Sequence, residues 1–273
     1  MIPQTCARVA GHFGEWLQGR LGSDGPIALV TVPCPALYVE VTLSGDGDMR
    51  IVQPDPAPLP PAQAARLLAA LGYPARGSLH VTATMAPGRG AGASTAALVA
   101  LARAFGAHDA DAIARACCAV EGASDPVMHD ASERLLWAPR RAVVLERLPA
   151  APAVEVIGGF LGDGEITDPE DTAFPDISDL IPEWRRAAET GDATLFARCA
   201  SQSASRTTAL RGPSDDPTAA LATSLGAMGH IRAHTGSARG LLFPTGGVPN
   251  GARDALHNAG VQDVLKFSTG DTS

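Results

Sequence analysis

The sequence predicts an α+β protein with two lobes. Segments with the composition of strands lie mainly in the first third of the chain, helical segments dominate the rest, and the two kinds do not alternate as in parallel α/β folds. With 273 residues, of which 45% are hydrophobic and 18% charged, the chain can fold around a substantial core. The run Leu-Pro-Ala-Ala-Pro-Ala at 148–153 marks the expected seam, which separates an N-terminal lobe, 1–150, from a C-terminal lobe, 151–273.

The first lobe is predicted to hold most of the strands. Concentrations of β-branched and apolar residues predict strands at 27–32, 36–43, 49–53 and 79–84. We expect the third of these to pair with the second across the turn Gly45-Asp46-Gly47. Helices are predicted at 62–71, 94–105 and 109–120. Gly72 ends the first helix, and Asp109 or Asp111 begins the last one.

The rest of the chain is predicted to be more helical. Strands at 142–147 and 154–160 lead into an acidic, proline-containing surface loop at 162–175. Further helices are expected at 177–189, 193–207, 217–228 and 252–259. Further strands are expected at 231–234, 240–243 and 261–267. Because aromatic residues make up only 4% of the chain, Ala, Val and Leu must fill most of the core.

The charge pattern argues against a nucleic-acid partner. The formal net charge is −8, and the arginines form no cluster denser than two neighbours. No window of about 18 apolar residues is present, so no membrane partner is expected. Five cysteines without a C-x-x-C pair, and an N-terminus without the layout of a signal peptide, fit a reducing cytoplasm. We therefore expect a cytoplasmic monomer or homodimer that acts on a small molecule.

A glycine-rich run before the helix at 94–105 is the most informative segment. Its residues are Pro87, Gly88, Arg89, Gly90, Ala91, Gly92, Ala93, Ser94 and Thr95. Glycines let the backbone approach an anion closely, and the free N–H groups of a helix start point towards it. Ser94 and Thr95 add hydroxyls that can bind a phosphate oxygen or Mg²⁺. The run therefore predicts a phosphate-binding loop.

Other interpretations of this run follow from the residues alone. A Walker A loop is excluded, because its motif requires a lysine and the only lysine is Lys266. Residues 88–93 also match G-x-G-x-x-A, with Asp109 and Asp111 about 20 residues further on, as in an NAD-binding oxidoreductase. A second helix, rather than the strand which that fold requires, follows the first. A structural turn before a buried helix is the remaining alternative.

Two acids that follow the predicted phosphate loop could take part in phosphoryl transfer. This reaction needs one carboxylate to bind the metal ion and another to orient or deprotonate the attacking hydroxyl. Glu121 lies at a helix C-terminus, where a negative charge is unfavourable unless a cation offsets it. Asp125 lies in a turn before Pro126, so both acids can face one cleft. An ordinary Asp-Pro turn is the alternative for Asp125.

Three segments resemble, in order, motifs of the GHMP kinase superfamily, which includes galacto-, homoserine and mevalonate kinases. The glycine-rich run resembles the loop P-x-x-x-G-L-G-S-S-A-A. The segment Gly11-His12-Phe13-Gly14-Glu15-Trp16-Leu17-Gln18-Gly19 is similar to the G-E-x-x-Q-G opening of the L-threonine kinase branch, which serves cobalamin assembly. The segment His234-Thr235-Gly236-Ser237-Ala238-Arg239-Gly240-Leu241-Leu242 resembles the glycine-containing third motif of the superfamily, again closest to the H-S-G-T-x-x-G-L form of that branch.

The resemblance implies a kinase that transfers the terminal phosphate of ATP to a hydroxyl. It implies a two-lobed GHMP kinase fold, with an N-terminal lobe like ribosomal protein S5 domain 2 and a ferredoxin-like C-terminal lobe. It implies that Glu121 and Ser94 bind Mg²⁺ and that Asp125 is the base or electrostatic partner of the acceptor hydroxyl. The implied acceptor is L-threonine, with homoserine or another small alcohol as the runner-up. A GHMP-fold binding protein without catalytic activity is a further alternative.

Further candidate site residues come from the flanking motifs. Glu15 and Gln18 could line the site, although Gln18 could equally be a solvated turn residue. Thr235, Gly236 and Ser237 form the glycine-containing part of the third motif. Arg206 and Arg239 are candidates for the carboxylate of a hydroxy amino acid, since a guanidinium can bind it bidentately, although a helix surface is the alternative place for either.

The phosphate loop departs from the superfamily pattern in three respects. It reads Ala-Gly-Ala where Gly-Leu-Gly or Gly-Met-Ala is usual, and it is one residue shorter. Arg89 replaces a lysine of some relatives, and its forked guanidinium meets a phosphate with different geometry.

Overall fold

The structure, a computed structural model, describes residues 4–164, 168 and 170–270 and has the predicted α+β architecture. The surface loop expected at 162–175 therefore lies partly outside the described residues. The strands are β1 (Thr5–Arg20), β2 (Ile27–Asp48), β3 (Arg50–Val52), β4 (Arg76–Ala83), β5 (Leu135–Ala138), β6 (Val143–Arg147), β7 (Val154–Leu161), β8 (Gly229–Arg232), β9 (Ala238–Phe243) and β10 (Val261–Thr269). The helices are α1 (Pro61–Ala70), α2 (Ala93–Ala104), α3 (Ala110–Glu121), α4 (Leu180–Thr190), α5 (Ala193–Arg211), α6 (Thr218–Ser224), α7 (Ala252–Asn258) and the 3-10 helix η1 (Ser132–Arg134).

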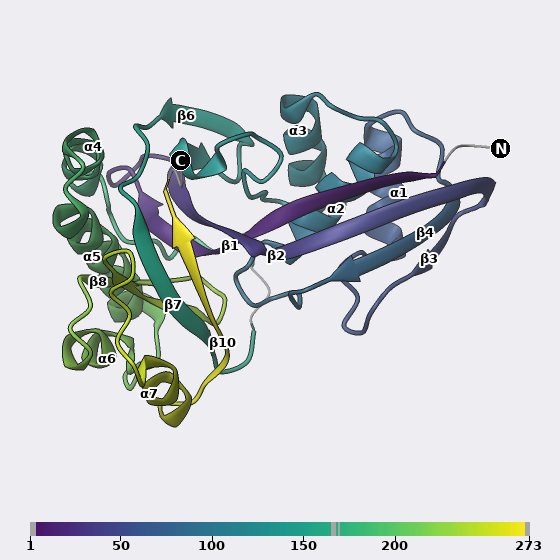
Figure 1. Ribbon diagram of the computed structural model, residues 1–273. Helices are drawn as coiled ribbons and strands as arrows, with labels where there is room; N and C mark the ends of the chain where they lie inside the picture. The colour runs from purple at the N-terminus through teal and green to yellow at the C-terminus, as the bar shows by residue number, and fades with distance from the viewer. Residues whose placement is uncertain (1–3, 165–167, 169, 271–273) are drawn as a thin grey trace.

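Two long antiparallel strands, β1 and β2, run through the middle of the molecule (Figure 1). The strands predicted at 27–32 and 36–43 are one continuous β2, which passes through Pro33 and Pro35. β1 is absent from the prediction, because its residues 11–19 are buried without alternation and include glycines and polar side chains. Its register against β2 shifts three times between residues 10 and 17. These irregularities lie within the first sequence motif.

One sheet contains strands from both halves of the chain, in the order β10-β7-β9-β8-β1-β2-β4-β3. The predicted pairing of residues 49–53 with the preceding strand is wrong, because Arg50–Val52 pair in parallel with β4 instead. β5 and β6 form an antiparallel hairpin beside β2. The strand that a dinucleotide-binding fold would require after α2 does not occur in the described stretch 93–121. Asp109 caps α3 there by accepting a hydrogen bond from the Ala112 N–H at 3.0 Å.

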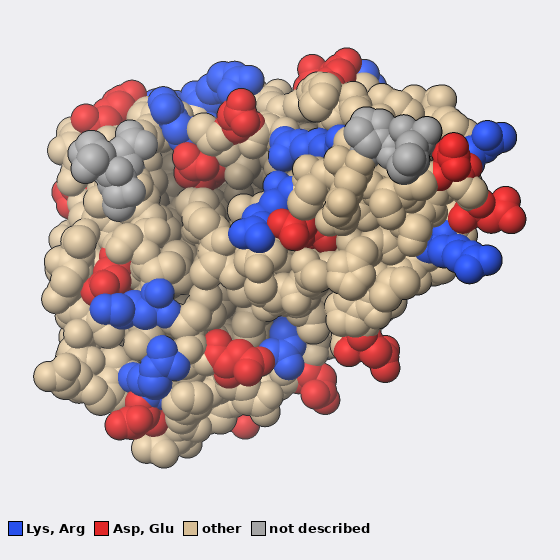
Figure 2. Space-filling view, turned by 45° about the vertical axis from the view of Figure 1, so that its right-hand side comes forward, with Lys and Arg blue, Asp and Glu red and all other residues tan. Residues whose placement is uncertain are grey.

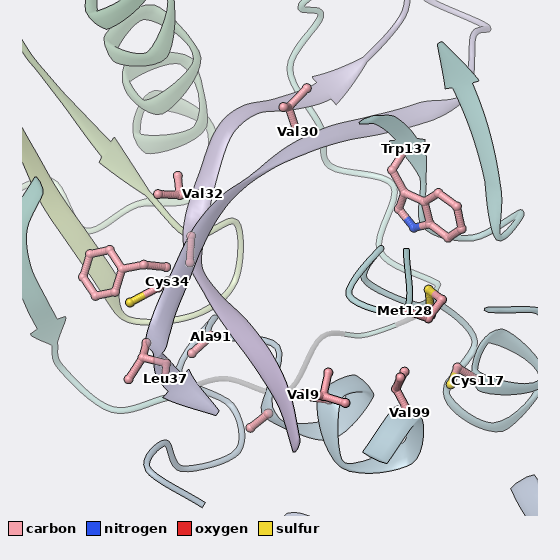
Figure 3. Packing of buried hydrophobic residues seen from close by; sticks show 14 of the residues in the cluster. Val9, Val30, Val32, Cys34, Leu37, Ala91, Val99, Cys117, Met128 and Trp137 are labelled. Carbon is pink, nitrogen blue, oxygen red and sulfur yellow. The ribbon is translucent and has the colours of Figure 1, made fainter. Parts of the chain in front are cut away.

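Helices α1, α2 and α3 lie against one end of the sheet, and α4–α7 lie at the other end (Figure 1). The packing around α2 depends on small side chains, because this helix is buried on nearly all sides and six of its 12 residues are alanine. Figure 3 shows buried side chains of β1, β2 and α2 in this core, among them Val9, Val30 and Val99. The prediction of a core filled by Ala, Val and Leu is confirmed.

Aromatic side chains of β1 pack against the second half of the chain. Phe13 meets Phe160 of β7 edge to face, with ring centroids 5.7 Å apart. Trp16 meets Phe196 of α5 in the same way, at 4.9 Å. The expected seam near residue 150 falls between β6 and β7, and the division into lobes at that point stays a prediction.

The surface carries both signs of charge. On the face shown in Figure 2, basic and acidic side chains are interspersed. In the described part of the chain, no helix combines the length and the apolar character that crossing a membrane would require.

Candidate active site

The phosphate loop, residues 87–95, connects β4 to the start of α2. Gly88, Gly90 and Gly92 all adopt the left-handed conformation, with φ of 80°, 75° and 71°. This backbone is strained for other residues, so the alternating glycines are needed for the shape of the loop. Gly92 is also the N-cap of α2, and no side chain caps the helix start. The first N–H groups of α2 are therefore left without a capping side chain, as an anion site requires.

Backbone hydrogen bonds hold the phosphate loop between the first and third motifs. The His12 and Gly14 N–H groups of β1 donate to the carbonyls of Ala91 and Gly90, both at 3.1 Å. On the other side, the Ala238 N–H donates to the Arg89 carbonyl at 3.1 Å. The three segments that the resemblance singles out are therefore neighbours in space.

Glu121 lies at the start of α2. It is the last residue of α3, and its carboxylate accepts hydrogen bonds from the hydroxyls of Ser94 and Thr95, the latter at 3.0 Å. Burial raises the pKa of Glu121 to about 7, although both hydroxyls oppose the rise. Glu121, at the C-terminus of α3, thus faces the start of α2, which the sequence predicts to bind phosphate.

Asp125 lies at the same place and pairs with a buried histidine. Its Oδ2 is 3.3 Å from His12 Nε2, and its N–H donates to Thr95 Oγ1 at 3.5 Å. A Cβ on Gly92 would lie 2.7 Å from His12 Nε2 and 3.2 Å from Asp125 Oδ2, so the glycine leaves room for this pair. Burial disfavours the charged form of both side chains. The attraction between the two charges is stronger than this effect, so it raises the pKa of His12 to about 9 and lowers that of Asp125.

Glu15 extends this cluster on the other side of His12. It is only 6% exposed, and its Oε1 lies 3.7 Å from His12 Nδ1. Burial raises the pKa of Glu15 to about 7, against the charge of His12 and a hydrogen bond from the backbone of His234. His12 belongs to the first sequence motif, but a single histidine in a sequence does not indicate a catalytic role. Only the fold brings it to Asp125.

Gln18 holds the surrounding structure together. It is 2% exposed, so the alternative of a solvated turn residue is wrong. Its side-chain amide donates to the Arg232 carbonyl at 2.9 Å, and its N–H donates to Ser203 Oγ at 2.9 Å. Gln18 therefore fixes β1 to β8 and α5.

The third motif forms the turn between β8 and β9 and packs on the phosphate loop. A Cβ on Gly236 would lie 2.2 Å from the backbone nitrogen of Gly90, so only glycine allows this contact. Ser237 is buried beside it, and its hydroxyl has no hydrogen-bond partner among the described residues. Thr235 precedes Gly236 in the same turn.

The arginines expected to bind an acceptor carboxylate are already engaged. Arg206 binds Asp179 through two hydrogen bonds of 2.6 Å. Arg239 is buried, and its Nε donates to Asp216 at 2.7 Å. Neither contacts the phosphate loop, Glu121 or Asp125 through its side chain in the described contacts.

Arg89 of the phosphate loop is engaged as well. It pairs with Asp263 at 2.5 Å and lies 5.0 Å from the ring centroid of Phe160. Asp263 is located at a register shift in β10 and has a φ of 49°.

Comparison with solved structures finds the same fold in well-defined enzyme classes. A mevalonate kinase of L. major, in complex with R-mevalonate, matches with a TM-score of 0.64 and 12% identity, over 100% of this chain and 97% of that one. A homoserine kinase from Cytophaga hutchinsonii matches with a TM-score of 0.59 and 15% identity, over 100% and 96%. A mevalonate diphosphate decarboxylase from Legionella pneumophila matches with a TM-score of 0.55 and 11% identity, over 97% and 100%. No protein-family model and no curated protein matches the sequence.

The chain therefore shares its α+β fold with these mevalonate and homoserine kinases along its whole length. Since a decarboxylase shares this fold, the reaction has to be argued from the site.

Proposed function

We propose that the protein is an ATP-dependent kinase that transfers the terminal phosphate of ATP to the hydroxyl of a small metabolite. One observation carries this proposal. The hydroxyls of Ser94 and Thr95 bind the Glu121 carboxylate at a helix start whose glycine loop is shaped for an anion, and Asp125 lies beside them. A phosphate cradle, a metal-binding acid and a second acid for the acceptor are the parts that phosphoryl transfer needs.

The donor set at this helix start fits Mg²⁺. The Ser94 hydroxyl and the Glu121 carboxylate are in contact, and Mg²⁺ prefers oxygen ligands, commonly one or two carboxylates with phosphates and waters. The described residues contain no group of three or more acids, histidines or cysteines that could hold a metal ion, so phosphate oxygens would supply further ligands. When bound, Mg²⁺ would neutralise negative charge on the phosphates.

Asp125 is the residue that we assign to the acceptor. The acceptor oxygen bonds to the γ-phosphorus, the bond from that phosphorus to the bridging oxygen breaks, and ADP leaves with its electron pair. Asp125 orients the hydroxyl and accepts its proton, while His12, as an imidazolium, keeps the carboxylate ionised. In a loose transition state orientation matters more than basicity, which suits a carboxylate with a lowered pKa.

L-Threonine is the acceptor that we favour. The likeness of the first and third motifs to the L-threonine kinase branch supports it, and with it a role in cobalamin assembly. Homoserine is the second candidate acceptor, because a homoserine kinase has the same fold. The cytoplasmic location that we propose is supported by five cysteines without a C-x-x-C pair.

The test is a screen for ADP release with Mg-ATP and threonine, homoserine, serine, mevalonate or sugars as acceptor. We expect acceptor-dependent release with one of them, most strongly with threonine, and a phosphorylated product of matching mass. Nucleotide binding without release in the presence of any acceptor would instead identify a binding protein without catalytic activity.

A further inference from the structure

A pocket of about 230 Å³ lies between α5, α6, β8 and β9. Residues lining it include Thr208, Ala209, Asp216, His230, Arg232 and Arg239. None of the residues of the phosphate loop, and neither Glu121 nor Asp125, lines this pocket. It is therefore distinct from the candidate active site.

Two arginines line this pocket, and both are only 4% exposed. Arg239 has a counter-charge, because its Nε donates to Asp216 at 2.7 Å. Arg232 donates to the Ala233 carbonyl at 3.0 Å and to the Thr208 hydroxyl at 2.9 Å, and both of these acceptors are neutral. Within the described parts of the chain, no carboxylate lies within ion-pair distance of Arg232.

The charges in the pocket do not cancel. The two arginines and Asp216 leave one positive charge, and burial lowers the pKa of His230, so this histidine is neutral near pH 7. Burial, together with the charges of Arg239 and Arg211, lowers the pKa of Arg232 to about 10, although the more distant carboxylates of Asp216 and Glu15 oppose this fall. A buried guanidinium without a direct ion pair is unfavourable, and an anion in the pocket would reduce that cost.

We propose that this pocket is a binding site for a small oxyanion, held by Arg232 with Arg239 beside it. A phosphate or carboxylate group provides the oxygens that a guanidinium binds best, whether as inorganic phosphate or as part of a small metabolite. Thr208 orients Arg232 for this contact.

The pocket is linked to the phosphate loop through the third motif. Arg239 Nη1 donates to the carbonyls of Gly236 at 3.1 Å and Ala238 at 2.9 Å. Gly236 packs on Gly90, and the Ala238 N–H donates to Arg89. An anion bound here would therefore steady the turn on which the phosphate loop rests.

Thermal unfolding of the full chain tests this site. Phosphate, sulfate or acetate would replace chloride at constant ionic strength, and the strongest response identifies the preferred oxyanion. Near saturation we expect the Tm of the wild type to rise by about 3 °C. The rise should disappear in Arg232→Met, which removes the cation, and in Ala209→Asp, which supplies a carboxylate at an exposed position of the lining. Arg206→Met, at an arginine already paired with Asp179, is the control and should keep it.

The outcomes are distinct. Phosphate bound only at the phosphate loop would raise the Tm equally in all variants, and that result would overturn the proposal. So would a wild type that responds to none of the oxyanions. If Arg232→Met does not fold, Ala209→Asp decides, because a retained response in that variant refutes the site.

Discussion

At the scale of single residues, the candidate site is organised by one buried cation between two acids. His12 lies 3.3 Å from Asp125 and 3.7 Å from Glu15, measured between the charged atoms. Its side chain is almost inaccessible, so its charge is unfavourable unless both acids stay close. Removing His12 would therefore leave two buried acids without a counter-charge.

The charge of His12 predicts a particular dependence of stability on pH. The folded-state pKa, about 9, lies above the ordinary value of 6.5, so His12 stabilises the fold fully below pH 6.5 and progressively less as the pH rises through 9. The free energy of unfolding should exceed that of His12→Gln by on the order of 3 kcal/mol at low pH, and the difference should vanish above pH 9. Urea unfolding between pH 6 and 9.5 measures it. His80→Gln, at an exposed position of β4, is the control, and a difference for His12→Gln that does not change with pH would contradict this charge.

The assigned roles predict strong losses of activity without loss of fold. Ser94→Ala and Asp125→Asn should each reduce turnover at least about 100-fold, the scale of one lost catalytic contact. ADP release measures the effect, and circular dichroism checks the fold. Asp111→Asn, an acid that is 73% exposed, should leave turnover unchanged. Normal ADP release in both variants would show that Ser94 and Asp125 do not have the proposed catalytic roles.

At the scale of elements, the site depends on two backbone turns in direct contact. The phosphate loop and the turn between β8 and β9 meet where Gly90 and Gly236 lack side chains. Because backbone atoms face each other there, neither turn can yield much to an added methyl group.

Gly236→Ala is therefore expected to displace the phosphate loop. Its Cβ would lie 2.2 Å from the nitrogen and 2.4 Å from the Cα of Gly90. We expect a loss of about 1–3 kcal/mol in the free energy of unfolding and at least about a tenfold increase in the KM for ATP. Gly47→Ala, where a Cβ would meet no atom within 4 Å, should change neither. A KM that stays at the wild-type value in Gly236→Ala would mean that the loop does not depend on this contact.

The elements that the sequence predicts well are those with local signals. The ends of α2 and α3 are predicted within a residue or two, because Gly92 and Asp109 mark their starts. Glu121 and Asp125 are predicted together, since four residues separate them. β1, the partner of β3 and the contact of His12 with Asp125 depend on packing between distant segments, which no local pattern records.

At the scale of the whole molecule, the two halves share both a sheet and a core. β1 of the first half pairs with β8 of the second through Glu15 and Arg232, and the rings of Phe13 and Trp16 pack on aromatic side chains of the second half. These contacts bury side chains that either half alone would expose to water.

We therefore expect the full chain to unfold in a single urea transition, and the fragment 1–150 not to fold on its own. Phe13 and Trp16 are 1% and 0% exposed in the full chain, and the aromatic rings that they contact all belong to residues 160–267. Circular dichroism and proton NMR of the fragment measure this. A cooperative transition of 1–150 alone would show instead that the predicted lobes are independent domains.

The irregular stretch of β10 has a consequence for nucleotide affinity. A β-bulge can re-aim a side chain, and the shifted register at Asp263 directs a carboxylate to the one guanidinium of the phosphate loop. On the proposed function, a triphosphate would have to compete with this internal anion for Arg89, or bind through backbone N–H groups alone. The outcome of that competition depends on how firmly β10 holds Asp263, so a strand near the end of the chain would set how tightly a loop in its first half grips ATP.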